Sequence, residues 1–286
     1  MLRYARNDVN IELIRVPLAV VTCLLLLFPA IAGAGPGLPV FDTHLHYSED
    51  VQKLIPPERA LELLDAAGIA HAVVSATPGP AVEVLYRLAP GRVVPFLRPY
   101  PTRAHRNTWF RDPELPDLLR AQLARIPYRG IGEFHVAGTN AGSATVKAII
   151  RLAQQHRLVL HAHTDLEGLQ LILAEADDTD VIWAHAGFDE PIATLQRLLE
   201  LHPRLWLELS YREGITEADR LTPAWRQLFT DYPRRFLVGT DTWSPQRWAE
   251  ISDLVTEARL WLAQLPTDIA QQIAYGNAGR LFGTDE

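Results

Sequence analysis

The chain has 286 residues, a formal net charge of −7 at pH 7 and a single cysteine. An acidic chain without a basic cluster does not attract the phosphate backbone of nucleic acid, so we expect no nucleic-acid partner. One cysteine can form no disulfide within the chain and cannot supply a thiolate metal site.

Residues 1–34 are predicted to form a secretory signal peptide. Three arginines precede a nearly continuous apolar run over residues 16–32, and Ala32-Gly33-Ala34 supplies the small residues that a signal peptidase needs. The protein would then be periplasmic or secreted. The alternative is an uncleaved anchor through residues 16–32, facing outside, because this run approaches the length of a bilayer span. Residues 35–286 are predicted to form one domain.

Short apolar runs alternate with segments of helical periodicity along that domain. Apolar residues at three- and four-residue steps predict helices such as 57–67, 143–156, 190–201 and 246–264. Runs rich in valine, isoleucine and leucine predict eight strands, near 39–44, 70–75, 92–98, 129–134, 157–162, 180–185, 204–209 and 235–240. Ser143 and Asp165 are predicted helix N-caps.

Eight strands, each followed by a helix, predict an α/β fold, a single (β/α)8 TIM barrel. A doubly wound open sheet is the main alternative, because the same alternation would also form it. The polar residues at the strand ends favour the barrel. The carboxyl ends of barrel strands converge on one axial pocket, whereas an open sheet would spread these residues along a crevice.

Residues of metal-ligand type follow five of the apolar runs. In Phe41-Asp42-Thr43-His44-Leu45-His46 the two imidazoles lie on one face of a strand, because side chains alternate with period two. Imidazole and carboxylate ligands without thiolate suit a divalent ion such as zinc. The other four runs are Gly132-Glu133-Phe134-His135, Leu160-His161-Ala162-His163, Trp183-Ala184-His185-Ala186-Gly187 and Val238-Gly239-Thr240-Asp241.

The order and spacing of these residues resemble the amidohydrolase superfamily of metal-dependent barrels. The ending Tyr275-Gly276-Asn277-Ala278-Gly279-Arg280-Leu281-Phe282-Gly283 resembles the closing helix of its amidohydrolase-2 branch. The resemblance implies one or two divalent ions, with zinc the expected metal. Glu133 would bridge two ions, but in a one-ion site it need not bind. The implied metal ligands are His44, His46, Glu133, His161, His185 and Asp241.

The same resemblance implies a metal-dependent hydrolase that cleaves an ester, lactone or amide bond of a small molecule with water activated by the metal. Asp241 would ligate the metal and act as the base, and His185 would be a ligand or a catalytic acid or base. A metal-dependent decarboxylase of the same branch is the alternative. An exported binding protein without turnover is a third interpretation, and a homo-oligomer is left open.

Three further residues are predicted to bind substrate. Arg98, at the end of a strand, either holds a substrate carboxylate bidentately or forms an ion pair in the barrel mouth. His135 lies where a loop faces the pocket. The resemblance places the strand-five ligand at His161, so His163 would lie further out and contact substrate or orient a ligand.

Strand seven and strand one carry polar residues that are predicted to support the site without binding the metal. Glu208 and Ser210 share one face of their strand and are predicted to orient substrate. Asp42 is expected to support a metal ligand or to cap a helix rather than to bind the metal.

Overall fold

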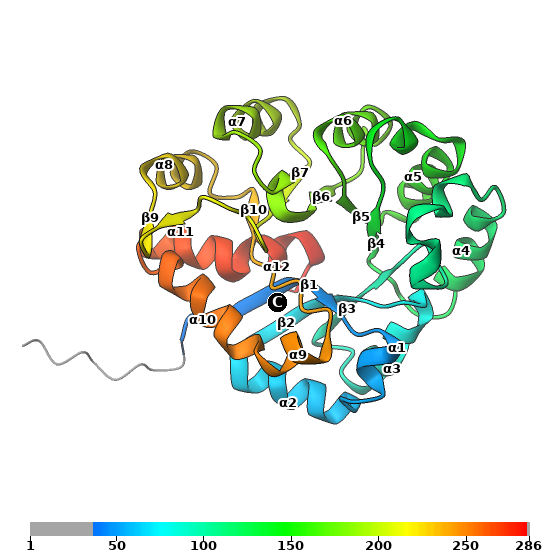
Figure 1. Cartoon of the computed structure of the whole chain (residues 1–286), viewed down its shortest axis with the longest axis horizontal. Coiled ribbons are helices and arrows are strands. Elements are labelled where there is room, and N and C mark those ends of the chain that lie inside the picture. The colour runs from blue at the N-terminus through cyan, green and yellow to red at the C-terminus, as the bar shows by residue number, and fades with distance from the viewer. Residues whose placement is uncertain (1–36, 285–286) are drawn as a thin grey trace, which may run out of the picture. The chain divides into compact units, whose positions relative to one another are not determined.

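The computed structural model describes residues 37–284. Within them, eight parallel strands form one sheet in which each strand pairs with the next along the chain (Figure 1). The strands are β1 (Val40–His46), β2 (Ile69–Ser75), β3 (Val93–Leu97), β4 (Gly130–His135), β5 (Val159–His163), β6 (Val181–Trp183), β7 (Leu205–Glu208) and β10 (Phe236–Leu237). All eight lie where the apolar runs predict them.

Backbone hydrogen bonds join the first strand to the last. The Thr43 amide donates to the Val238 carbonyl and the His46 amide donates to the Thr242 carbonyl, each at 2.9 Å. β1 is therefore bonded on both edges, to β2 and to the segment around β10. The sheet closes into a barrel, which confirms the predicted (β/α)8 arrangement and excludes the open sheet.

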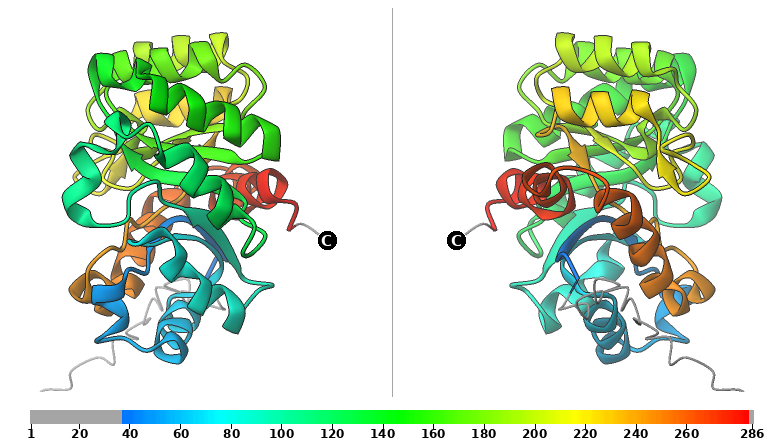
Figure 2. Two further views of the ribbon diagram at one scale, coloured as in Figure 1. Left: turned by 90° about the vertical axis from the view of Figure 1, so that its right-hand side faces the viewer. Right: turned by 90° about the vertical axis from the view of Figure 1, so that its left-hand side faces the viewer.

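The helices lie on the outer face of the sheet (Figure 2). The predicted caps are confirmed, because the Ser143 and Asp165 side chains accept backbone N–H bonds at the starts of α5 (Ala144–His156) and α6 (Leu166–Glu175). The helices are α1 (Glu49–Gln52), α2 (Pro57–Ala67), α3 (Glu83–Leu88), α4 (Leu115–Leu123), α5 (Ala144–His156), α6 (Leu166–Glu175), α7 (Ile192–Leu201), α8 (Pro223–Asp231), α9 (Pro245–Ala249), α10 (Ile251–Leu262), α11 (Thr267–Gln271) and α12 (Asn277–Phe282).

One prediction of local structure needs correction, and one element was not predicted. The single helix expected over 246–264 is two helices, α9 and α10, which meet at Glu250. A two-stranded antiparallel hairpin, β8 (Thr216–Glu217) with β9 (Arg220–Leu221), follows β7 and was not predicted.

The barrel interior holds its own apolar cluster at the amino ends of the strands. The rings of Phe41 and Phe96 each lie 5.7 Å from the ring of Phe282, which belongs to α12. α12 therefore packs against this end of the barrel and leaves the carboxyl ends of the strands for polar residues. The cluster consists of Phe41, Val73, Val94, Phe96, Val159, Ile182, Leu237, Ala278 and Phe282.

β1 departs from strict alternation, and this departure positions its histidines. Its pairing with β2 shifts register between Asp42 and Leu45. Phe41 packs inside the barrel and Leu45 packs in the outer core. Perfect alternation would turn Phe41 and His44 to opposite faces, so the shift lets one strand carry both the interior ring and the two histidines.

The predictions for residues 1–34 lie outside the described residues. Signal peptide, anchor and exported location therefore stay predictions. Within residues 37–284, no helix combines the length and the apolar character that crossing a membrane requires.

The buried carboxyl of Asp42 bridges the two chain segments that close the barrel. Its Oδ1 accepts the amides of His44 (3.0 Å) and Thr240 (3.1 Å), and its Oδ2 accepts the Thr240 hydroxyl (2.7 Å). Burial raises the pKa of Asp42 to about 7, although the hydrogen bonds from Thr240 and His44 oppose the rise. The carboxyl thus ties β1 to the chain after β10, as the supporting role expected for Asp42 requires.

We predict that Asp42→Ala lowers the free energy of unfolding of the metal-free protein by about 3 kcal/mol, because buried donors lose their acceptor. Asp42→Asn should cost less, since its amide oxygen still accepts both backbone amides. Urea denaturation followed by circular dichroism measures both. Equal stability of the wild type and Asp42→Ala would show that the closure does not depend on this carboxyl.

Candidate functional site

The structure brings the six predicted metal ligands together at the carboxyl ends of the strands. They come from β1, β4 and β5, from the turn after β6 and from the segment after β10. All six are buried within the described part of the chain. They are His44, His46, Glu133, His161, His185 and Asp241.

The centre of the cluster consists of two imidazoles and two carboxylates. The Nε2 atoms of His44 and His46 lie 3.2 Å apart. Asp241 Oδ1 lies 3.4 Å from His44 Nε2 and 3.0 Å from His46 Nε2. The Glu133 oxygens lie 3.5 Å from His44 Nε2 and 3.3 Å from His46 Nε2. Four side chains therefore point their nitrogen and oxygen atoms at one small region.

The other nitrogen of each imidazole already has a partner. His44 Nδ1 lies 2.8 Å from Glu208 Oε2, and His46 Nδ1 lies 2.7 Å from Ser75 Oγ. If Nδ1 of His44 donates its hydrogen to Glu208, Nε2 presents a lone pair to the oxygens of Asp241 and Glu133. Lone pairs and carboxylate oxygens at this separation repel each other unless a cation lies between them, so the donor set fits a divalent ion.

The electrostatics of His44 show that the centre of the cluster favours positive charge, whether from a proton or from a metal ion. Burial disfavours its charged form, but the charges of Asp241, Glu133 and Glu208 outweigh burial and raise the pKa of His44 well above its usual value. Burial likewise opposes ionisation of Asp241, but His44 and His46 hold the pKa of that carboxyl below its usual value. The carboxylates stay charged and stabilise positive charge at the centre of the cluster.

His185 directs its Nε2 at the Glu133 carboxylate. Its Nδ1 lies 2.9 Å from the Ser210 carbonyl oxygen, and its Nε2 lies 3.8 Å from Glu133 Oε1. Burial lowers the pKa of His185, so the ring is neutral at neutral pH and its Nε2 can accept a proton or bind a metal.

The two histidines of β5 differ in their contacts. His163 Nδ1 lies 2.8 Å from Glu133 Oε1, and its side chain is 28% exposed. The ring of His161 packs 4.5 Å from that of His44, and its buried Nε2 has no hydrogen-bond partner among the described residues. His163, predicted to contact substrate, is thus the one that contacts the strand-four carboxylate.

The structure places Arg98 in an ion pair inside the barrel mouth, one of its two predicted roles. Its Nη2 lies 2.6 Å from Glu133 Oε2, and its side chain is only 10% exposed. His135 stacks on His163 with ring centroids 4.2 Å apart, and its Nδ1 lies 3.0 Å from the Tyr100 hydroxyl. Burial lowers the pKa of His135 to about 3, although Glu133 opposes the change.

Glu208 is a site residue whose role the sequence analysis assigned differently. It is fully buried and accepts from the Ser210 hydroxyl (2.9 Å) and the His185 amide (3.1 Å), besides its contact with His44 Nδ1. It therefore orients histidines and does not reach substrate. A Cβ at Gly239 would clash with its carboxylate, so this glycine provides the space. An acid inside the apolar run of β7 was the available sequence signal.

A cavity of about 550 Å³ opens over the cluster. Its lining includes the cluster residues His46, Glu133 and Asp241, and Arg103 and Arg106 from the segment after β3. The guanidinium of Arg103 lies 6.0 Å from the ring of Trp243, another lining residue. The wall around the cluster is therefore cationic and partly aromatic.

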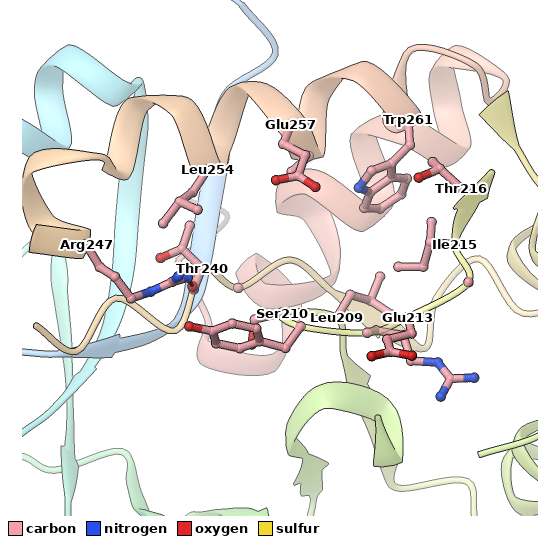
Figure 3. Close-up of a pocket in the computed structure, with 15 residues that line it drawn as sticks. Leu209, Ser210, Glu213, Ile215, Thr216, Thr240, Arg247, Leu254, Glu257 and Trp261 are labelled. Carbon is pink, nitrogen blue, oxygen red and sulfur yellow. Dashed lines mark hydrogen bonds between the residues drawn. The ribbon is translucent and has the colours of Figure 1, made fainter. Parts of the chain in front are cut away.

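A second cavity, of about 460 Å³, lies between α10 and residues 209–216 (Figure 3). Leu254, Glu257 and Trp261 of α10 form one wall, and Ser210 and Thr240 also line the space. None of its described lining residues is a histidine. None of the predicted ligands therefore lines this second cavity. Ser210, which does line it, contacts His185.

Solved structures with this fold come from several bacteria. A protein of Pseudomonas putida described as a 2-pyrone-4,6-dicarboxylic acid hydrolase has 18% identity and a TM-score of 0.60, over 87% of this chain and 99% of its own. A 2,6-dihydroxybenzoate decarboxylase complexed with 2,6-dihydroxybenzoate has 14% identity and a TM-score of 0.55, over 86% and 99%. A further protein, from Acinetobacter baumannii, has 2-pyrone-4,6-dicarboxylic acid hydrolase as its description and citric acid bound. It has 16% identity and a TM-score of 0.54, over 85% and 99%. At these identities the likeness shows the fold.

No curated protein matches the chain in sequence. A family model, Amidohydrolase of the amidohydrolase-2 type, matches residues 41–284, a stretch that contains every residue of the cluster. Together with the barrel and the gathered histidines and carboxylates, this match shows that the chain belongs to the amidohydrolase family and is an enzyme.

Proposed function

We propose that this enzyme is a metal-dependent hydrolase that cleaves an ester, lactone or amide bond of a small molecule in the cavity over the cluster. The observation that carries the proposal is the set of imidazole nitrogens and carboxylate oxygens that His44, His46 and Asp241 direct at one small buried region. His44, His46 and Asp241 would hold the ion. Zinc is the proposed metal, because the ligands are imidazoles and carboxylates.

His163 is the proposed strand-five ligand in place of His161. It contacts Glu133 and lines the cavity, whereas His161 is buried against the ring of His44. The proposed role of His161 is to hold His44 in place. His185 stays a candidate for ligand or for catalytic acid, because its neutral ring offers Nε2 to the site.

A divalent ion in this position supplies an acidified water and polarises the group under attack. Asp241 is suited to accept the proton, because it is ionised and lines the cavity. Arg247 fixes the backbone beside it by donating to the carbonyl oxygens of Asp241 (2.9 Å) and Thr240 (2.6 Å). The proposed general base therefore sits on a segment that Arg247 helps to hold in place.

The proposed substrate carries a carboxylate. Arg98 is engaged by Glu133, but Arg103 and Arg106 line the outer cavity, and Trp243 offers an aromatic wall. Guanidinium groups bind carboxylates with paired hydrogen bonds, and aromatic rings pack on flat apolar groups. The similar structures described as acting on or binding dicarboxylic and aromatic acids support this choice.

The same cavity favours decarboxylation of an aromatic or unsaturated acid as the second candidate, because a carboxylate held near the cluster is the group that such an enzyme removes.

The sequence pattern of residues 1–34 supports export as the proposed location. Amino-terminal sequencing of the mature protein from the cell envelope and medium tests export, and an intact Met1 in a cytoplasmic fraction would contradict it.

We predict that the zinc-loaded enzyme hydrolyses carboxylated lactones or esters with release of a proton, measured in a pH-stat, and that a chelator abolishes turnover until zinc is restored. Aromatic and enoic acids are assayed in parallel for carbon dioxide. Carbon dioxide without hydrolysis of any lactone, ester or amide would replace the hydrolase by the decarboxylase.

Asp241→Asn should lower kcat by roughly 10²- to 10⁴-fold, because the amide cannot accept the proton. Steady-state kinetics on the best substrate measures the loss, and circular dichroism checks the fold. Asp253→Asn, at an exposed position of α10, is the matched control and should leave kcat unchanged. An unchanged kcat in Asp241→Asn would remove this carboxylate from the proposed mechanism.

Glu208→Gln should weaken zinc binding by about 10- to 100-fold, because a neutral amide holds the hydrogen on His44 Nδ1 less firmly than a carboxylate and makes His44 a weaker electron-pair donor to the metal. Competition with a chromophoric chelator measures the affinity. Glu213→Gln, an exposed change on the nearby loop, is the control. Equal affinity of Glu208→Gln and wild type would mean that Glu208 does not tune the site.

A further inference from the structure

A third cavity, the recess, has a volume of about 550 Å³ and shares two lining residues with the cavity over the cluster. These are His135 and His163, whose rings stack with centroids 4.2 Å apart. The two spaces therefore meet at these imidazoles. Among the residues that line the recess are Phe110, His135, Val136, Ala137, His163 and Phe188.

The recess differs in chemistry from the cavity over the cluster. Phe110, Val136 and Phe188 give it apolar walls from three segments of the chain, those after β3, β4 and β6. Such walls favour an uncharged apolar group, and phenyl rings favour a flat one. Arg103 and Arg106 line the cavity over the cluster but not the recess.

The charges of the two spaces set the direction in which a substrate would lie. Among the described residues that line the recess there is no arginine or lysine, whereas Asp165, Asp189 and Glu190 belong to its lining. These carboxylates would repel the carboxylate of the substrate. The charged end therefore belongs with Arg103 and Arg106, and the recess is left for the opposite end.

Phe188 is a large apolar side chain that remains 38% exposed. The Asp189 amide donates to the Gly187 carbonyl oxygen (2.9 Å), so Phe188 is the centre of a three-residue turn with φ of 61° and ψ of −81°. Turns of this form are rare and strained. Arg212, from the segment after β7, donates to the Phe188 carbonyl oxygen, and the ring centroid lies 4.4 Å from that of His185. The ring is therefore held in its exposed position by other parts of the fold.

Both phenyl groups of the recess are tied to the shared wall of imidazoles. The centroid of the Phe188 ring lies 5.3 Å from that of His163. Trp109, the neighbour of Phe110, donates its indole N–H to the His135 carbonyl oxygen (2.8 Å). The apolar walls are thus positioned relative to the cluster before any substrate binds.

We propose that the recess is a subsite for an aryl group of the substrate, on the side of the scissile bond away from the carboxylate. This inference rests on the proposed function, and Phe188 is its specificity-determining residue. The substrate class is a dicarboxylic acid esterified at one end with an arylalkyl alcohol. Water adds to the ester carbonyl carbon and the bond from that carbon to the alkoxy oxygen breaks. The alcohol leaves with one proton of the water, and the new carboxylic acid releases the other to solvent.

Binding of paired carboxylates tests the recess without turnover. Matched series of alkanoates and ω-phenylalkanoates differ only in the ring, and isothermal titration calorimetry on the zinc-loaded protein gives the Kd of each. We expect the ring to tighten binding about 10-fold or more once the linker is long enough, because a phenyl group leaves water. Phe188→Ala should reduce this gain to about 3-fold or less. Ala137→Trp fills the recess and should also remove the gain, and the extended backbone of Ala137 (φ −140°) accepts the larger side chain.

Two control variants show where the ring binds. Trp243→Ala removes the aromatic wall of the cavity over the cluster, and Leu201→Ala shortens an exposed side chain at the end of α7. Both should keep the gain. Loss of the gain in Trp243→Ala, with its retention in Phe188→Ala and Ala137→Trp, would place the ring on Trp243 and overturn the subsite. Equal affinity of the two series for the wild type would overturn it as well. If Phe188→Ala does not fold, Ala137→Trp decides.

Turnover separates this inference from the proposed function. We expect the mono(phenylethyl) ester of a dicarboxylic acid to have a kcat/KM about 10-fold or more above that of the monomethyl ester, and Phe188→Ala to remove most of this difference. Hydrolysis of both esters with equal kcat/KM would refute the subsite and leave the hydrolase. Binding that depends on the ring, without hydrolysis of any ester, lactone or amide, would refute the hydrolase and leave the subsite.

Discussion

The burial of ionised carboxylates at the mouth of the barrel is the constraint on which the rest of the site depends. Glu133 and Glu208 are almost fully enclosed, and such groups are tolerated only where donors or cations surround them. Here His44 links them, with Glu208 on one ring nitrogen and Glu133 and Asp241 near the other. The same interactions that compensate the buried charge hold His44 in the orientation that a metal ligand needs.

The architecture could be predicted because it depends on local signals. Apolar runs predict strands, and three- and four-residue periodicity predicts helices, so α2 has the expected bounds, 57–67. The break between α9 and α10 was missed, since the apolar residues Trp248, Ile251 and Val255 continue one helical face across it. Closure of the barrel could be inferred from the polar strand ends, but only the bonds between β1 and the chain around β10 establish it.

The site could be predicted less completely than the fold, because its contacts join distant parts of the chain. The family resemblance implies six ligands at the strand ends, and the structure brings these side chains together. The choice between His161 and His163 depends on the register shift in the pairing of β4 with β5 between Gly132 and Phe134, which one sequence does not reveal. The partner of His44 Nδ1 is Glu208, 164 residues away, and no local pattern connects them.

The backbone is strained at two residues of the site, and side chains from distant parts of the chain hold both of them. His185 and Asp241 both have left-handed backbones, with φ of 60° and 45°, and such conformations cost on the order of 1–3 kcal/mol each in residues other than glycine. Glu208 accepts the His185 amide and Arg247 donates to the Asp241 carbonyl oxygen, so each strained residue is fixed by a charged side chain from elsewhere in the fold. The side chains of Glu208 and Arg247 thus hold two of the proposed functional residues in conformations that set where the His185 and Asp241 side chains point.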